Sequence, residues 1–197
     1  YNNSIREYIR NFIMSKLETN TIDTISGTSN LTIGSSNAST ITLKSGATLT
    51  NFPTNTPAFR IEKSSNQTIS NNTRTKATFN SEIYDTNNAF ASDKFTVPSG
   101  EAGKYQFTTL LRFYCDANNA ALTSVGFYKN GSTLDTDANF ELTNNSTDSI
   151  RQTAIPYTTT LNLSVNDYIE VYGLIKGGGT LYISSGSYFE GQKLIGV

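Results

Sequence analysis

The regular alternation of side chains at residues 103–115, GKYQFTTLLRFYC, constrains the fold of this chain more than any other feature. A period of two residues is that of a β-strand with one face packed on a core and the other face turned toward solvent. The pattern therefore predicts a long strand within a β domain. Five side chains fall together on one face of this strand: Tyr105, Phe107, Thr109, Leu111 and Phe113.

Shorter candidate strands accompany this one between residues 57 and 197. The turns between them are rich in Asn, Asp, Ser and Gly, and Asn130-Gly131 is a strong hairpin signal. The run Lys176–Gly179 lacks the features of a phosphate loop, so we expect a wide hairpin turn there. About eight to ten short strands favour a closed sandwich or jelly roll. The candidate strands are 57–64, 75–86, 94–98, 103–115, 122–134, 140–144, 152–166, 167–176 and 180–197.

Residues 4–17, SIREYIRNFIMSKL, carry apolar side chains at the spacing of one helical face. Ser4 is a suitable N-cap, and Glu7 completes a capping-box pattern. We therefore expect a short amphipathic helix in residues 1–19. A helix of this length is marginal alone in water, so it must pack on a neighbour or on copies of itself, as an attachment or trimerisation element. A membrane-surface helix is the weaker alternative because Glu7 interrupts the basic face, and no apolar run is long enough for membrane insertion.

Residues 20–56 contain pairs of apolar residues that recur at intervals of about ten positions, with small polar turns between them. The pairs are Ile22 and Ile25, Leu31 and Ile33, Ile41 and Leu43, and Leu49 and Phe52. So little apolar mass cannot bury enough surface to fold as a monomer. The segment is expected to be a β-rich stalk that packs against copies of itself, with a flexible linker as the alternative. Pro53 and Pro57 mark its boundary with residues 57–197.

The charge and residue counts exclude several functional classes. The net charge is −1, with 15 basic and 16 acidic residues, which argues against a nucleic-acid partner. The chain has no histidine, which removes His-dependent nucleophilic catalysis and His-bound zinc. Its one cysteine, Cys115, forms no disulfide within the chain and is expected to be a small apolar side chain. No carboxylate pair is singled out for glycosidase chemistry, so we expect no enzymatic activity.

An aromatic-rich stretch from Phe79 to Phe107 resembles the signature of C1q-like domains, the globular heads of the C1q/TNF-like superfamily. Six of its positions match the signature at the right spacing: Phe79, Asp85, Phe90, Gly103, Tyr105 and Phe107. Two positions depart, because Val97 and Thr109 stand where the family has aromatic residues. At the end of the chain, Phe189 and Gly191 follow Ser187 as in the terminal Ser-x-Phe-x-Gly strand of that family.

The resemblance implies a ten-stranded all-β jelly roll in residues 57–197 that assembles as a homotrimer and shares its threefold axis with the stalk. The stalk has no Gly-X-Y period; it resembles segments of bacteriophage tail-fibre proteins. We therefore predict a trimeric virion fibre or appendage protein that other virion proteins hold through the N-terminal helix. Its head is expected to bind a host surface glycan or protein, or to cap the fibre. A capsid-decoration or collar protein without a receptor, and a secreted recognition protein of a cellular organism, are the alternatives.

The motif residues are expected to form the core and the trimer-facing packing, not a ligand site. No cofactor is predicted, although loop aspartates could bind calcium. Aspartates in turns are more commonly solvated, and the ones concerned are Asp116, Asp135, Asp137 and Asp148. Matches to the glycosylation motif are explained by the abundance of Asn, Ser and Thr, and include Asn30, Asn37, Asn66 and Asn162. Four tyrosines are candidates for ligand contact, although packing is their commoner role: Tyr114, Tyr128, Tyr182 and Tyr188.

Overall fold

A computed structural model of the chain describes residues 45, 55–134, 139–144 and 149–195. Every regular element in these residues is a β-strand, and none of the described segments forms a helix with the length and hydropathy needed to cross a membrane. The described domain belongs to a compact unit of residues 51–197. The helix predicted in residues 1–19 and nearly all of the stalk predicted in residues 20–56 lie outside the described residues.

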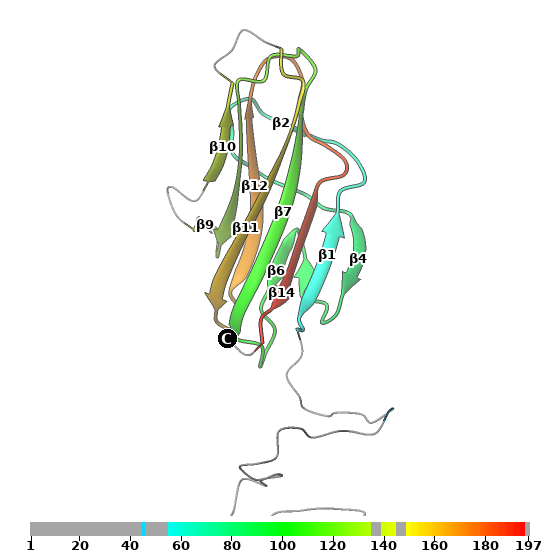
Figure 1. The fold of residues 1–197 in the computed structure, drawn as a ribbon, viewed down its shortest axis with the longest axis vertical. Coiled ribbons are helices and arrows are strands. Elements are labelled where there is room, and N and C mark those ends of the chain that lie inside the picture. The colour runs from blue at the N-terminus through cyan, green and yellow to red at the C-terminus, as the bar shows by residue number, and fades with distance from the viewer. Residues whose placement is uncertain (1–44, 46–54, 135–138, 145–148, 196–197) are drawn as a thin grey trace, which may run out of the picture. The chain divides into compact units, whose positions relative to one another are not determined.

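Two antiparallel sheets of seven strands each face one another (Figure 1). In the first, sheet A, the long strand β7 is central: it pairs with β11 along one side and with β13 and β14 along the other. The strands of sheet A are β1 (Ala58–Glu62), β2 (Gln67–Ile69), β4 (Ser81–Asp85), β7 (Gly103–Cys115), β11 (Gln152–Leu163), β13 (Leu181–Ile183) and β14 (Tyr188–Lys193). Strands β4 and β11 therefore lie at opposite edges of sheet A.

Sheet B follows the order β10-β8-β12-β6-β5, with β9 paired to β8 and β3 paired to β12. Its strands are β3 (Thr75–Lys76), β5 (Phe90–Ala91), β6 (Lys94–Thr96), β8 (Leu122–Lys129), β9 (Ser132–Thr133), β10 (Asn139–Thr143) and β12 (Tyr168–Lys176). The curled antiparallel sheets agree with the predicted jelly roll, although the described residues form fourteen strands where the resemblance implied ten.

The core lies between the sheets and is rich in aromatic rings. The inward face of β7 supplies the five side chains predicted from the alternation, and each of them is at most 1% exposed. Phe59 of β1 packs against Phe95 of β6 with ring centroids 5.1 Å apart, and against Phe189 of β14 at 4.9 Å. Such contacts hold the two sheets together because burial of aromatic surface is the largest stabilising contribution per residue.

The strand predicted at 75–86 is wrong, because the chain crosses between the sheets inside it. Strand β3 belongs to sheet B and β4 to sheet A, and residues 77–80 connect them. The buried Lys63 fixes this crossing, since its Nζ donates to the carbonyl and the hydroxyl of Thr78 at 2.7 and 2.8 Å. Burial lowers the pKa of Lys63. Ala77 and Phe79 in the crossing are buried, whereas Ile83 on β4 is 54% exposed.

The turns give one confirmed prediction and one correction. Asn130 and Gly131 have φ angles of 52° and 78° and connect β8 to β9 in a tight hairpin, as their sequence predicts. The run Lys176–Gly179 is not a hairpin turn, because β12 lies in sheet B and β13, which follows it, lies in sheet A. Glycine suits this crossover because a side chain at Gly178 or Gly179 would collide with Asn119 or Asp116.

The two ends of the sandwich have different chain segments (Figure 1). Ala58, the first residue of β1, pairs with Gln192 near the end of β14, so the chain enters and leaves the domain at one end. The opposite end holds Cys115 at the end of β7 and the start of β11. We call these the near end and the far end.

Candidate interaction surface

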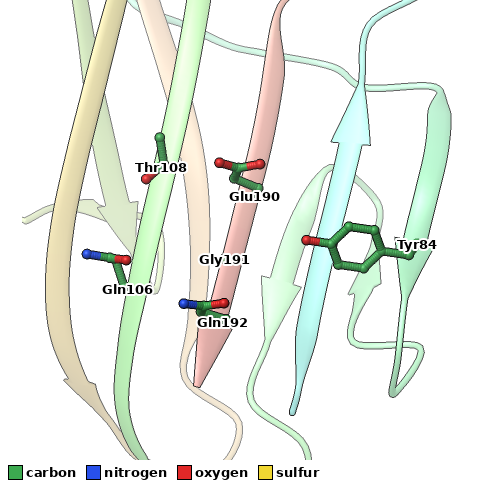
Figure 2. Close-up of a pocket in the computed structure, with 6 residues that line it drawn as sticks. All are labelled: Tyr84, Gln106, Thr108, Glu190, Gly191 and Gln192. Atoms are coloured by element: carbon green, nitrogen blue, oxygen red, sulfur yellow. The ribbon is translucent and has the colours of Figure 1, made fainter. Parts of the chain in front are cut away.

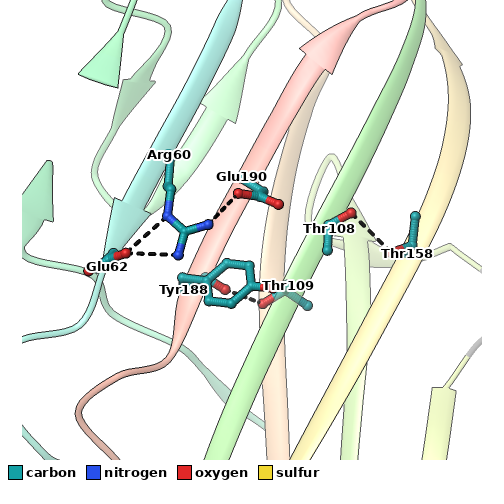
Figure 3. A network of polar contacts seen from close by, with 7 residues as sticks. All are labelled: Arg60, Glu62, Thr108, Thr109, Thr158, Tyr188 and Glu190. Carbon is teal, nitrogen blue, oxygen red and sulfur yellow. Dashed lines mark hydrogen bonds and ion pairs between the residues drawn. The ribbon is translucent and has the colours of Figure 1, made fainter. Parts of the chain in front are cut away.

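The outer surface of sheet A is a broad polar face, here called the sheet A face. Alternate residues of β11, β7, β14 and β1 point outward on it because their neighbours point into the core. Two threonines show the register: the hydroxyls of Thr108 on β7 and Thr158 on β11 lie 3.0 Å apart (Figure 3). The next residue, Thr109, points inward and donates its hydroxyl to the Tyr188 carbonyl at 2.7 Å.

Arg60 organises the part of the sheet A face over β1 and β14. Its guanidinium donates to Glu62 at 2.9 Å and to Glu190 at 2.7 Å, and it lies over the ring of Tyr188 at 4.2 Å (Figure 3). Burial alone would lower the pKa of Arg60, but the hydrogen bonds to the two carboxylates outweigh it and raise the pKa. These side chains are about one-third exposed, so the network orders the surface more than it stabilises the fold.

A shallow cavity of about 160 Å³ lies beside this network (Figure 2). Its lining is mostly polar and comes from three strands of the sheet A face: Tyr84, Gln106, Thr108, Glu190, Gly191 and Gln192. Small-molecule sites have volumes of about 300–1,000 Å³ and apolar linings, so this cavity does not fit that class. It is better suited to receive one or two side chains of a partner surface.

Exposed apolar side chains gather at the two opposite sides of the sandwich. On β4, Ile83 is 54% exposed and Tyr84 is 44% exposed, and on β10, Phe140 is 52% exposed and Leu142 is 45% exposed. We call these the β4 edge and the β10 edge. Most exposed apolar residues of soluble proteins are scattered singly, so two pairs on opposite edges indicate contact surfaces.

The β10 edge continues the hydrophobic core outward. Phe140 is opposite the buried Val125 in the β8–β10 ladder, so both side chains point to the interior side of sheet B. Tyr157 on β11 is half-buried and stacks on the core residue Phe127, with ring centroids 5.3 Å apart. The apolar side of sheet B therefore extends to its edge at β10, where a partner can cover the exposed side chains of Phe140 and Leu142.

No protein-family model and no curated protein matches the sequence. Among solved structures, the globular domain of the zebrafish complement 1qA protein aligns with a TM-score of 0.51 and 17% identity, covering 70% of this chain and 97% of that one. The described domain has a C1q-like fold. The crystal structure of murine APRIL at pH 5.0 aligns with a TM-score of 0.48 and 14% identity, covering 70% of this chain and 98% of that one.

Within the C1q-like fold, the aromatic motif residues lie in one core cluster. Phe107 of β7 lies 5.9 Å from Phe189 and 5.9 Å from Tyr105 between ring centroids. Phe79 and Phe90 pack on the same cluster at 6.3 Å from one another. The two departures from the family signature are also buried: Val97 and Thr109 are both 0% exposed. Apart from the partly buried Phe90, these side chains are at most 8% exposed and so belong to the core.

The other motif residues have backbone roles. Asp85 accepts hydrogen bonds from the backbone of Ala89 at 3.0 Å and Phe90 at 2.8 Å, which fixes the turn between β4 and β5. Gly103 has a φ of +150°, which other residues rarely adopt. A side chain at Gly191 would meet the ring of Phe107 at 2.5 Å, so close packing of strand β14 on the core requires glycine there.

The four candidate tyrosines are all half-buried on outward faces. Tyr114 and Tyr182 come together on sheet A at 5.9 Å, whereas Tyr128 stacks on Tyr172 of sheet B at 3.9 Å. Tyr188 lies under Arg60, as described above. They therefore belong to three separate places on the C1q-like fold and do not form one site.

The aspartates considered for calcium are not brought together in the described residues. Asp116 accepts a backbone hydrogen bond from Thr180 at 2.6 Å, and Asp135, Asp137 and Asp148 lie outside those residues. The part of the chain that the structure describes contains no cluster of three or more His, Cys, Asp or Glu. Cys115 is buried, and its Sγ lies 3.2 Å from both the Asn119 side-chain oxygen and the Gly178 carbonyl, either of which can accept its one S–H.

Sequence reasoning missed the residues that distinguish this surface, above all Tyr84, Phe140 and Leu142. The segment around Phe140 was predicted as a weak strand, and its two apolar residues alternate as in any half-buried strand. The sequence holds no signal for their exposure, because exposure depends on which strand lies next to β10.

Proposed function

We propose that this chain is the protomer of a non-enzymatic, homotrimeric binding protein in which the C1q-like domain forms the head. The observation that carries the proposal is the pair of apolar edges on opposite sides of the sandwich. The absence of histidine from the chain and the polar, shallow character of the cavity on the sheet A face support a binding role over a catalytic one.

The two edges are different surfaces, so a contact between them is heterologous. Heterologous contacts generate a ring when the rotation between copies closes. The β10 edge of one protomer would cover the β4 edge and the neighbouring cavity of the next, so that Phe140 packs near Tyr84 of another copy. Three copies are the number that the resemblance to C1q-like heads implies.

We further propose that the trimer is a virion fibre or appendage protein. Its support is the tail-fibre-like pattern of residues 20–56 and the amphipathic pattern of residues 1–19, which would join it to other virion proteins. The head would then present three equivalent surfaces to a host glycan or protein. Three weak sites on one particle bind far more tightly than one, because the second and third contacts are intramolecular. Immunogold labelling of purified particles tests this placement.

The test of the oligomer uses single serine substitutions at each edge. Wild-type protein is expected to have a mass of about three times the 21.5 kDa of one chain by light scattering. In the chain of residues 51–197, which lacks the predicted helix and nearly all of the predicted stalk, Phe140→Ser and Ile83→Ser should each lower the mass to that of the monomer, since each removes apolar contact area from the interface. Val165→Ser is the matched control, because Val165 is 37% exposed but lies on neither edge.

A mixture of the two variants distinguishes a heterologous contact from a symmetric one. Each variant retains the edge that the other has lost, so a heterologous contact predicts that the mixture forms pairs of one copy each. If Phe140→Ser dissociates the protein and Ile83→Ser does not, β10 edges pair with one another and the ring is wrong. A wild-type chain that is monomeric would reject the proposal as a whole.

A further inference from the structure

Two of the four described arginines lack an acidic partner among the described residues. Arg60 pairs with Glu62 and Glu190, and Arg74 lies 3.9 Å from Glu141. Arg112 and Arg151 form no ion pair with any described carboxylate, although both are exposed. Two guanidinium groups without a described acidic partner therefore lie in one region of the described surface.

The topology places these two arginines beside one another at the far end of the sheet A face. Arg112 is on β7 and Tyr114 follows it two residues later on the same face, a separation of about 7 Å along a strand. Arg151, next to the first residue of β11, stacks on Tyr114 with its guanidinium 4.9 Å from the ring centroid and donates to the Tyr114 hydroxyl. Tyr114 therefore lies between the two cations.

A shallow cavity of about 180 Å³ opens at this place. Arg112 forms part of its wall. Four of the other lining residues offer a hydroxyl, an amide or a small side chain, namely Gln152, Thr153, Ala154 and Ser184, and the fifth is Phe113. Ala154 is opposite Arg112 in the β7–β11 ladder and is exposed, so no bulky side chain covers the guanidinium from β11. The Arg112 guanidinium donates to the Ser185 carbonyl at 3.5 Å, which is a weak hydrogen bond.

The aromatic side chains beside the two arginines indicate the kind of ligand that would carry an anionic group to them. Tyr182 of β13 is opposite Tyr114, and the two rings lie 5.9 Å apart at 51°. Half-buried tyrosines present an apolar ring and a polar hydroxyl at the same surface, which suits a ligand with both apolar and hydroxyl groups. The cavity holds only about six water volumes, so it accommodates a terminal group and not a whole drug-sized molecule.

We propose that Arg112, Arg151, Tyr114 and Tyr182 form a binding site for the terminal acidic sugar of a saccharide. The oxyanion, a carboxylate or a sulfate, would accept paired hydrogen bonds from the guanidinium groups, whose planar geometry matches it. The sugar ring would lie against the tyrosines. This inference deepens the proposed function by naming the ligand class, but the site is built within one protomer and does not depend on the number of copies.

The experiment compares two sugars that differ only at the charged group, using the full chain. Methyl β-glucuronide and methyl β-glucoside are titrated in saturation-transfer NMR, and the oligomeric mass is measured on the same sample. The glucuronide is expected to bind about tenfold more tightly than the glucoside, the effect of one charge-assisted hydrogen bond. Excess sodium sulfate should displace the glucuronide, since sulfate offers the same oxyanion.

Three variants locate the site. Arg112→Gln and Arg151→Gln should each lower glucuronide binding to the level of the glucoside. Lys104→Gln is the matched control, because it removes one positive charge from the same face of β7 near the other end of the strand. Equal binding of the two sugars, no displacement by sulfate, or an equal loss in Lys104→Gln would each overturn the site. A monomeric mass with glucuronide binding intact would reject the trimer and keep the site.

Discussion

At the scale of single residues, Asp85 shows how a signature position is explained by local hydrogen bonding. Both oxygens of its carboxylate are used: Oδ1 accepts from Ala89 N and Oδ2 from Phe90 N. In this turn the backbone N–H of Thr86 donates to the Ala58 carbonyl of β1, whereas those of Ala89 and Phe90 donate to the Asp85 carboxylate. Unpaired N–H groups near a core are costly, and Ala89 is only 6% exposed. A carboxylate at this position is therefore a requirement of the turn and not of a ligand.

The corresponding prediction compares two substitutions of Asp85. Asp85→Asn keeps one acceptor and directs an amide group at a backbone donor, and Asp85→Ala removes both acceptors. We expect losses of about 1–2 and about 2–3 kcal/mol in the free energy of unfolding, measured by urea denaturation. Glu82→Gln on the same strand is the control, since Glu82 is exposed, and it should change stability by less than about 0.5 kcal/mol. Equal stability of Asp85→Ala and the control would contradict this role of Asp85.

At the scale of elements, the sequence predicts a strand well when its own alternation decides the structure. The predicted strand at 103–115 is β7 over its full length, because buried and more exposed side chains alternate along the whole of it. The strand at 75–86 failed because Ala77 and Phe79 continue the alternation through a crossing between sheets. The buried contacts of Lys63 that fix this crossing join residues 15 positions apart, and no local pattern reveals them.

The candidate surface follows the same rule. The polar and apolar faces of β7 and β11 could be predicted from alternation, but the apolar edges could not. Whether Phe140 is covered depends on how β10 lies relative to β11, which belongs to the other sheet. The Arg112 site likewise depends on three strands that the chain visits far apart in sequence, β7, β11 and β13. Such arrangements depend on which strands the topology brings together, so local patterns in a single sequence do not predict them.

Two hairpins show the same limit and lead to a prediction. The Asn130-Gly131 turn was predicted from its sequence. Ser92 and Asp93 form the β5–β6 turn with φ angles of 53° and 57°, and this turn was not predicted. Positive φ at both central residues is typical of a type I′ turn, for which serine is a poor choice at the first position. Ser92→Asn should therefore stabilise the domain by about 0.5 kcal/mol, because asparagine tolerates this conformation better.

The Ser92 prediction is checked by urea denaturation of wild type and variant. Asp93 should be left in place, since its Oδ1 accepts a hydrogen bond from Phe79 N at 2.7 Å and so joins the turn to the crossing segment. Asn130→Ser, the reverse exchange at the equivalent position of the β8–β9 turn, should destabilise by a similar amount or more, because Asn130 also bonds Asp167 at 2.8 Å. A loss of stability in Ser92→Asn would contradict the idea that the positive φ of Ser92 lowers the stability of the domain.

At the scale of the whole molecule, the described domain carries both its core and its contact surfaces within residues 51–197. Its core joins the two sheets through one continuous cluster of buried side chains, so the domain has what it needs to fold as one cooperative unit. The β4 edge and the β10 edge also belong to this unit, and so does the acidic-sugar site. Association and ligand binding should therefore both be properties of the head.

A shortened chain of residues 51–197 tests this statement. We expect it to unfold in a single transition followed by circular dichroism, with a midpoint within about 5 °C of the full chain at equal molar concentration. Its mass by light scattering should be about three times that of one shortened chain, because the edges that form the ring are present. Only native chains associate, so a higher protein concentration stabilises the native state. The unfolding midpoint of the shortened chain should therefore rise with protein concentration. A folded but monomeric shortened chain would place the association in the first fifty residues, and the two edges would then have to be explained as binding surfaces for a different protein.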